Sequence, residues 1–212
     1  MKPFLVSAGL LVLIPALALA ESSLIPPNAP PGGAPAPTQM SSEKTRDSWY
    51  IGFGLGTGQG YFVGNSGTKS FGDDGLNTRV ALNFKIGATL NPRTLLGLDI
   101  TALRGQGTVS SGFGNIDAAA QFTNYLLMGT IFPWEKGMFV RGGLGLGVAI
   151  AEVSGQTASR YGMGGDVGLG YAFWMGQHFN LTANVDYAYQ YLANNNGENT
   201  SMLIGGMGFD WY

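Results

Sequence analysis

Residues 179–192 read FNLTANVDYAYQYL, and apolar side chains alternate in this stretch with polar ones. The odd positions from Phe179 to Tyr191 carry only Phe, Leu, Ala, Val and Tyr, whereas Asn, Thr, Asp and Gln dominate the even positions. A period of two residues is typical of a β-strand, because successive side chains of a strand point to opposite faces, and a helix would need a period near 3.6. The stretch therefore predicts a strand with one apolar face and one polar face.

The same alternation recurs along most of the second part of the chain, where we expect eight strands. In residues 76–90, for example, Val80, Leu82 and Ile86 face away from Asn83 and Lys85. The fourth strand is ambiguous, because Phe122, Leu126 and Met128 compete with Tyr125, Leu127 and Ile131 for the apolar face, and its register stays open. The expected ranges are 49–60, 76–90, 93–104, 118–132, 138–151, 161–175, 179–192 and 199–212.

The connections between these strands alternate in length. Residues 91–92, 133–137 and 176–178 are short turns, whereas 61–75, 105–117, 152–160 and 193–198 are longer and polar. An even-stranded antiparallel barrel of the outer-membrane type has short periplasmic turns and longer extracellular loops. The sequence thus predicts an all-β fold, an eight-stranded antiparallel up-and-down transmembrane β-barrel.

The polar face decides between a membrane barrel and a soluble, lipocalin-like barrel. It is made mostly of small residues, which fit a narrow interior and would cover a soluble surface poorly. Its glycines include Gly52, Gly54, Gly56, Gly143, Gly145, Gly147, Gly164, Gly168 and Gly170. The bulky face carries aromatic residues near both strand ends, and two aromatic girdles are typical of the two membrane interfaces. We assign to them Trp49, Phe132, Trp134, Phe139, Phe173, Phe179, Phe209 and Trp211 at one end, and Tyr61, Phe62, Phe71, Phe122, Tyr161, Tyr187, Tyr189 and Tyr191 at the other.

Composition agrees with a membrane barrel and excludes several other classes. Charged residues make up 11% of the chain, against about 25% in soluble domains. The net charge of -2 provides no basic field for nucleic acid, so no nucleic-acid partner is expected. With 0 cysteines the chain can form neither a disulfide nor a lipidated N-terminal cysteine.

The N-terminal part divides into two segments. Residues 1–20 have a basic start, an apolar run and small residues at Ala18 and Ala20, which predicts a secretory signal peptide cleaved before Glu21. Residues 21–47 are rich in proline and predict a disordered periplasmic leader, either a passive tail or a docking segment. The barrel itself is expected to span residues 48–212.

Residues 49–212 resemble the small eight-stranded bacterial outer-membrane β-barrels of the OmpA and OmpX type, on the strand pattern and on the aromatic C-terminal strand. The resemblance implies recognition of that strand by the barrel-assembly machinery, which reads a terminal aromatic residue. Here Tyr212 shares the polar register with Asp210, whereas Trp211 and Phe209 carry the apolar one. Either Tyr212 or Trp211 can therefore be the functional end. The family's peptidoglycan-binding domain has no counterpart in this sequence.

Charged residues on the polar face suggest the chemistry of the interior. A charge in a narrow barrel needs a partner, so we expect a salt-bridge and hydrogen-bond network, with an ion or proton path as the alternative. The residues concerned are Arg79, Lys85, Asp99, Arg141, Asp166, Asp186 and Asp210. His178 lies in an expected periplasmic turn, and Asp73 and Asp74 are at most a weak Ca²⁺ site. We expect no catalytic, cofactor or metal site, and no enzymatic activity.

Two kinds of function fit these expectations. The first is a structural or surface-interaction protein with a closed polar interior, in which Tyr61, Phe62, Phe71 and Phe113 in or beside the outer loops contact an unidentified extracellular ligand. The second is a narrow channel for small apolar solutes, like the OmpW-type barrels, and interior charges such as Lys85 and Asp186 disfavour it. The expected partners are outer-membrane lipid, lipopolysaccharide and the barrel-assembly machinery, and the expected location is the bacterial outer membrane.

Overall fold

The computed structural model describes residues 46, 48–64, 67–73, 75–111, 114–134, 137–193 and 199–212. The described residues belong to one compact unit, Ser41–Tyr212. They form the strands β1 (Trp49–Gly64), β2 (Gly67–Ser70), β3 (Thr78–Asn91), β4 (Thr94–Ser111), β5 (Gly114–Ile131), β6 (Gly137–Val153), β7 (Gln156–Trp174), β8 (Phe179–Leu192) and β9 (Asn199–Trp211). The expected signal peptide and, apart from Arg46, the expected leader lie outside the described residues, as do Asp74 and Phe113.

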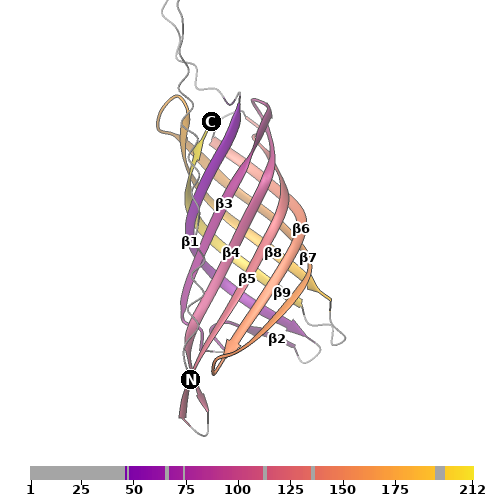
Figure 1. The fold of residues 1–212 in the computed structure, drawn as a ribbon. Coiled ribbons are helices and arrows are strands. Elements are labelled where there is room, and N and C mark those ends of the chain that lie inside the picture. Colours follow the sequence, from indigo (N-terminus) through magenta and orange to yellow (C-terminus); the bar gives the residue numbers. More distant parts are fainter. Residues whose placement is uncertain are drawn as a thin grey trace, which may run out of the picture. The chain divides into compact units, whose positions relative to one another are not determined.

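The strands form one closed antiparallel barrel (Figure 1). Each strand from β3 to β9 pairs with its sequence neighbour, and β1 pairs with both β3 and β9. The short β2 pairs only with the far end of β1, so among the described residues the wall consists of eight strands. The expected eight-stranded up-and-down barrel is confirmed. None of the described residues belongs to a helix that is long and apolar enough to cross a membrane.

Three of the expected outer loops are wrong. Residues 61–64 continue β1, and residues 67–70 form β2. Residues 105–111 and 114–117 continue β4 and β5, and residues 156–160 continue β7, which meets β6 through a turn at Ser154 and Gly155. Both turn residues have positive φ angles, 52° and 75°, as a tight two-residue hairpin requires. The polar composition of these segments suggested loops, but paired strands need no apolar face once they extend into water.

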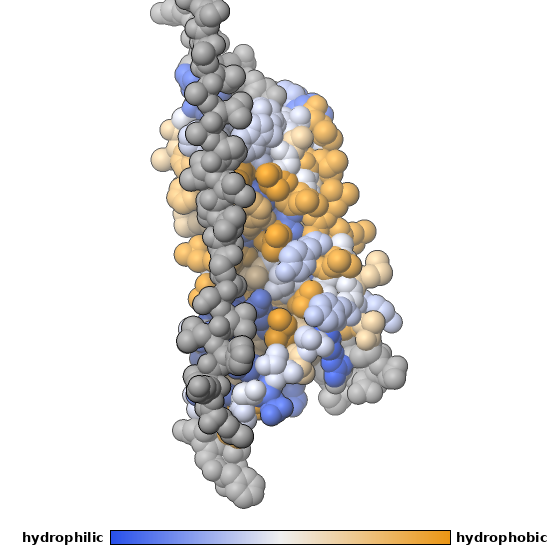
Figure 2. Space-filling view, viewed as in Figure 1, coloured by the Kyte–Doolittle hydropathy of each residue, from blue (hydrophilic) through white to orange (hydrophobic). Residues whose placement is uncertain are grey.

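The face assignment is confirmed along the middle of the barrel. Val185 in β8 is 50% exposed and Leu144 in β6 is 70% exposed, whereas Asn180 and Asp186 are buried inside. The ambiguous β5 turns Phe122, Leu126 and Met128 inward, and it exposes Tyr125, Leu127 and Ile131. Apolar side chains consequently cover much of the visible outer wall, and polar ones gather towards the end that carries β2 (Figure 2).

Part of the expected aromatic girdles is wrong, because five of those side chains point into the barrel. Phe71 and Phe122, with the half-buried Phe62, belong to an interior apolar cluster at the β2 end. Phe132 and Phe139 belong to a second cluster at the short-turn end, together with Tyr50, Leu95, Ala172 and Tyr212. Since an eight-stranded interior is just wide enough to be filled by side chains, bulky residues can occupy both of its ends. The outward positions of Trp49, Trp134, Tyr161, Phe173, Tyr187, Tyr189, Tyr191, Phe209 and Trp211 are confirmed.

Candidate functional site

A polar layer crosses the barrel between the two apolar clusters. At its centre the Arg141 guanidinium donates from Nε to Asp186 Oδ1 at 2.6 Å and from Nη1 to Asp99 Oδ2 at 3.2 Å. All three side chains are almost fully buried. The bridge connects strands β4, β6 and β8, which are not sequence neighbours, and therefore braces the barrel across its interior.

Neighbouring side chains satisfy further lone pairs of these carboxylates. Asn83 donates to Asp99 at 2.5 Å and to Thr101 at 2.8 Å, and Asn184 donates to Asp186. A second ion pair joins Lys85 Nζ to Asp210 Oδ1 at 2.8 Å, nearer the short-turn end. The expected interior network is thus confirmed for five of its charged members: Lys85, Asp99, Arg141, Asp186 and Asp210.

The other two predicted members do not join these ion pairs. Asp166 is buried in the same layer, but neither of its carboxylate oxygens has a hydrogen-bond partner among the described residues. Arg79 is only half-buried and lies near the start of β3, away from the layer. Hydrogen bonding therefore concentrates on Arg141, which has two acidic partners.

Two small cavities border the polar layer in the described part of the chain. One cavity of about 20 Å³ lies beside Arg141, Asn184 and Asp186, and another of about 10 Å³ lies beside Lys85 and Asp210. Each has room for about one water molecule. The interior is apolar, polar and apolar again along its axis, so the expected polar interior is found in the middle layer, between two apolar clusters.

A much larger recess lies on the outer face of the wall, beyond the apolar band. Thr78, Gln106, Ala119 and Glu152 form one row of directly opposed residues across β3, β4, β5 and β6. This row lies two positions beyond the exposed Val80 on β3, on the same face. The row and the residues beside it line a hollow of about 760 Å³, in which the small Ala119 takes up little space.

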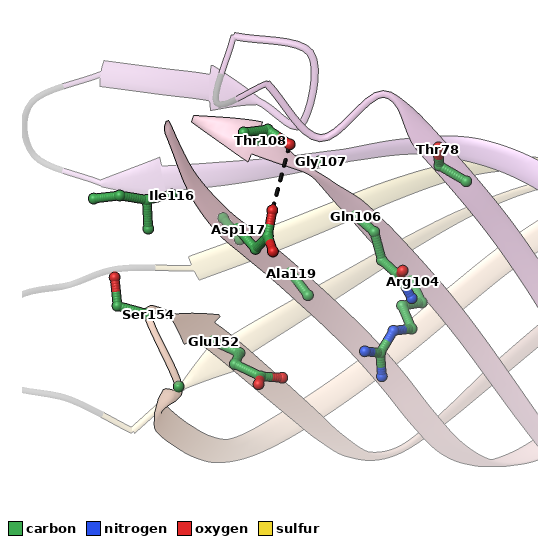
Figure 3. A pocket seen from close by; sticks show the side chains of 12 residues that line it. Thr78, Arg104, Gln106, Gly107, Thr108, Ile116, Asp117, Ala119, Glu152 and Ser154 are labelled. Carbon is green, nitrogen blue, oxygen red and sulfur yellow. Dashed lines mark hydrogen bonds between the residues drawn. The ribbon is translucent and has the colours of Figure 1, made fainter. Parts of the chain in front are cut away.

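The recess brings together charges of both signs with hydroxyl and amide groups (Figure 3). Arg104 is its cation, and Asp117 and Glu152 are its carboxylates. The Thr108 hydroxyl donates to Asp117 Oδ1 at 3.5 Å, a weak bond that leaves the carboxylate available for a ligand. The recess therefore offers donors and acceptors on several strands at once, with an excess of acidic groups.

The other two residues that the sequence singled out, Asp73 and His178, take part in local hydrogen bonds. The Ser70 amide and hydroxyl both donate to Asp73 at 2.9 Å, and these bonds hold the pKa of the Asp73 carboxyl below its usual value. The backbone carbonyl of His178 accepts the Tyr212 amide at 2.9 Å. The described residues contain no group of three or more His, Asp or Glu side chains arranged to hold a metal ion.

Sequence reasoning missed the recess, because residues 105–117 and 152–160 were expected to be loops. One signal could have found it. Arg104 and Glu152 continue the outward register of β4 and β6 directly after apolar residues, so a charged patch replaces the apolar band on two strands of the same sheet. The observed pairing shows that β5 lies between these two strands and joins their charged residues into one patch. The sequence alone does not show this.

Comparison with solved structures finds the same architecture. Ail, the attachment invasion locus protein of Yersinia pestis, in complex with the heparin analogue sucrose octasulfate, matches with a TM-score of 0.52 and 17% identity, over 78% of this chain and 99% of that chain. A further structure of Ail matches with a TM-score of 0.51 and 16% identity, over 78% and 99% of the two chains. Neisserial surface protein A has a TM-score of 0.48 and 13% identity, over 77% and 96%. No protein-family model and no curated protein matches the sequence.

Proposed function

We propose that this chain, which has the fold of the small eight-stranded outer-membrane β-barrels, is a bacterial surface protein that binds a hydroxyl-rich ligand in the recess on β3 to β6. The main support is the position of the recess, directly beyond the apolar band at the end opposite the short turns. In barrels of this class that end is extracellular. The barrel is then a rigid anchor, and the extended hairpins carry the binding surface.

The charges of the recess indicate the class of ligand. Ail was solved with a polysulfated heparin analogue. In this chain two carboxylates face one guanidinium, which disfavours a polyanion. Hydroxyl and amide groups from Thr78, Gln106 and Thr108 suit the hydroxyls of a saccharide. We therefore expect a neutral saccharide, supplied either by a host surface or by lipopolysaccharide.

Binding measurements on the purified protein in detergent test this proposal. The probes are a fluorescent neutral oligosaccharide, lipopolysaccharide and heparin. We expect Arg104→Ala to weaken saccharide binding, and we expect Asp117→Asn combined with Glu152→Gln to strengthen heparin binding. Gln59→Ala on β1 is the control outside the recess. Unchanged binding of all three probes in both recess variants would contradict the proposal, and retention of lipopolysaccharide alone would identify the membrane as the source of the saccharide.

A narrow channel for small apolar solutes is the alternative, and one observation favours it: both ends of the interior are lined by apolar side chains. The packed layer around Arg141 lies between them and would block such a path unless it moved. Uptake of small apolar solutes into vesicles that contain the protein would favour the channel over the surface protein.

The proposal also includes processing and location. Cleavage before Glu21 should release a mature chain, with the proline-rich residues 21–47 in the periplasm. Assembly into the outer membrane should depend on the barrel-assembly machinery and on β9. The mass of the protein purified from a membrane fraction measures the cleavage site, and a chain that still begins at Met1 would contradict it.

A further inference from the structure

The short-turn end of the barrel holds a buried arginine that belongs to no strand. Arg46 lies just before β1 and is 2% exposed. Its guanidinium carbon lies 3.5 Å from the centre of the Phe132 ring, 5.1 Å from that of Trp174 and 5.7 Å from that of Tyr212. One cation thus contacts three aromatic rings, all within the range of cation–π attraction.

These three rings, which we call the aromatic box, come from separate parts of the wall. Phe132 follows β5, Trp174 ends β7, and Tyr212 follows β9. The Phe132 amide donates to the Arg93 carbonyl at 2.8 Å, and the Tyr212 amide donates to the His178 carbonyl at 2.9 Å. Trp174 and Tyr212 also pack against each other, with ring centres 5.8 Å apart. The barrel therefore holds the box in place through contacts that do not involve Arg46.

The chemistry of the box suits a guanidinium better than an ammonium. A guanidinium is planar and weakly hydrated, so it can stack on aromatic faces with less loss of hydration than a lysine side chain. Deeper inside, in the same register as Tyr212, Asp210 adds a negative charge and pairs with Lys85. A cavity of about 10 Å³ is lined by this ion pair and by Phe132, the ring on which Arg46 stacks.

We propose that the aromatic box is a guanidinium-binding site, that the chain fills it with its own Arg46, and that this contact seals the short-turn mouth of the barrel. When Arg46 is removed, water reaches the Lys85–Asp210 pair, and the box accepts a guanidinium from solution. The proposal concerns the opposite end of the barrel from the recess and does not depend on ligand binding there.

Thiol labelling tests the seal, because the chain has 0 cysteines and one introduced cysteine gives an unambiguous signal. Thr130→Cys places a thiol in the wall of the small cavity behind the box. With a polar maleimide we expect slow labelling in this parent and a rate about tenfold higher after Arg46→Ala, since a desolvated cation–π contact is lost. Gln177→Ala, at an exposed position in a short turn at the same end, is the control and should label like the parent.

Chemical rescue tests the ligand class. Ethylguanidinium should return the labelling rate of the Arg46→Ala protein towards that of the parent, and ethylammonium at the same concentration should not. The difference in gel mobility between boiled and unboiled samples verifies that every variant is folded, and Arg46→Lys replaces Arg46→Ala if the latter fails that check. Labelling that Arg46 substitution leaves unchanged would overturn the seal, and equal rescue by both compounds would overturn the guanidinium site.

Discussion

Val185 and Asn184 are neighbours in β8 and face opposite sides of the wall. Val185 points outward among other apolar side chains, and Asn184 points inward and donates to Asp186. The same substitution must therefore have different consequences at the two positions. On the outer face the cost comes from the lipid, and on the inner face it comes from crowding and from lost hydrogen bonds.

Val185→Arg should be strongly disruptive, because a cation on the lipid face near the middle of the bilayer costs about 2 to 4 kcal/mol. Val185→Leu is the matched control and should fold like the parent. The measurement is the fraction that folds into lipid vesicles, read from the mobility of unboiled samples. Normal folding of Val185→Arg alongside failure of Asn184→Leu would mean that the two faces are inverted.

Arg141→Met should destabilise the barrel by about 3 to 5 kcal/mol, since it leaves the Asp99 and Asp186 carboxylates buried without their cation. Adding Asp99→Asn and Asp186→Asn to this variant should recover most of the loss, because the uncompensated charges are then gone. Urea unfolding in detergent measures both variants. If the protein with Arg141→Met alone were as stable as the parent, the network would have no structural role.

At the scale of elements, β9 closes the barrel because it pairs with β1 on one side and with β8 on the other. The sequence left open whether Trp211 or Tyr212 is the functional end, and the structure places these two residues on opposite sides of the wall. Trp211 points outward and is 59% exposed, whereas Tyr212 points inward, is 6% exposed and contributes to the aromatic box. Trp211 therefore occupies the lipid-facing register, and Tyr212 belongs to the mouth.

Deletion of residues 209–212 should prevent insertion, since it removes the pairing of Phe53 with Phe209 and of Ile51 with Trp211. Unpaired backbone groups in hydrocarbon cost several kcal/mol each. Deletion of Tyr212 alone keeps this pairing and should yield a folded barrel with a less tightly closed mouth. Protease resistance in membrane fractions measures both, and complete loss of insertion without Tyr212 would assign the assembly signal to that residue.

At the scale of the whole molecule, apolar and polar layers follow one another along the described interior, and the cavities beside Arg141 and Lys85 measure only about 20 and 10 Å³. Open aqueous pores need about sixteen strands, whereas eight strands leave an interior that side chains can fill. This packing supports the proposed role as an anchor.

The intact protein in planar bilayers should show no stable conductance of porin size, because the Arg141 layer bridges β4, β6 and β8 across the interior. The Arg141→Met protein is the comparison, and we expect brief openings from it as the brace between β4, β6 and β8 is lost. Steady, porin-sized current from the unmutated chain would contradict the closed barrel.

The sequence by itself determined the barrel, its strand number, and the direction of most side chains in the apolar band. The physical reason is that lipid outside and a narrow interior impose opposite preferences on alternate residues, and residues 179–192 display both. The same rule identified Lys85, Asp99, Arg141 and Asp186 as interior charges, because a charge on the outer face at that level would be too costly.

Only the tertiary structure decided the remaining features. The first of them lie beyond the apolar band, where lipid no longer covers the outer face of the wall. Beyond the apolar band both faces of a strand meet water, so polar composition no longer separates a hairpin from a loop, and residues 105–117 could not be assigned. At the ends of the interior, bulky residues fit inside as well as outside, which is why Phe71 and Phe132 were misplaced. The pairing of Arg141 with Asp186, the recess across β3 to β6 and the aromatic box around Arg46 all join residues far apart in sequence, and only the closed barrel brings them together.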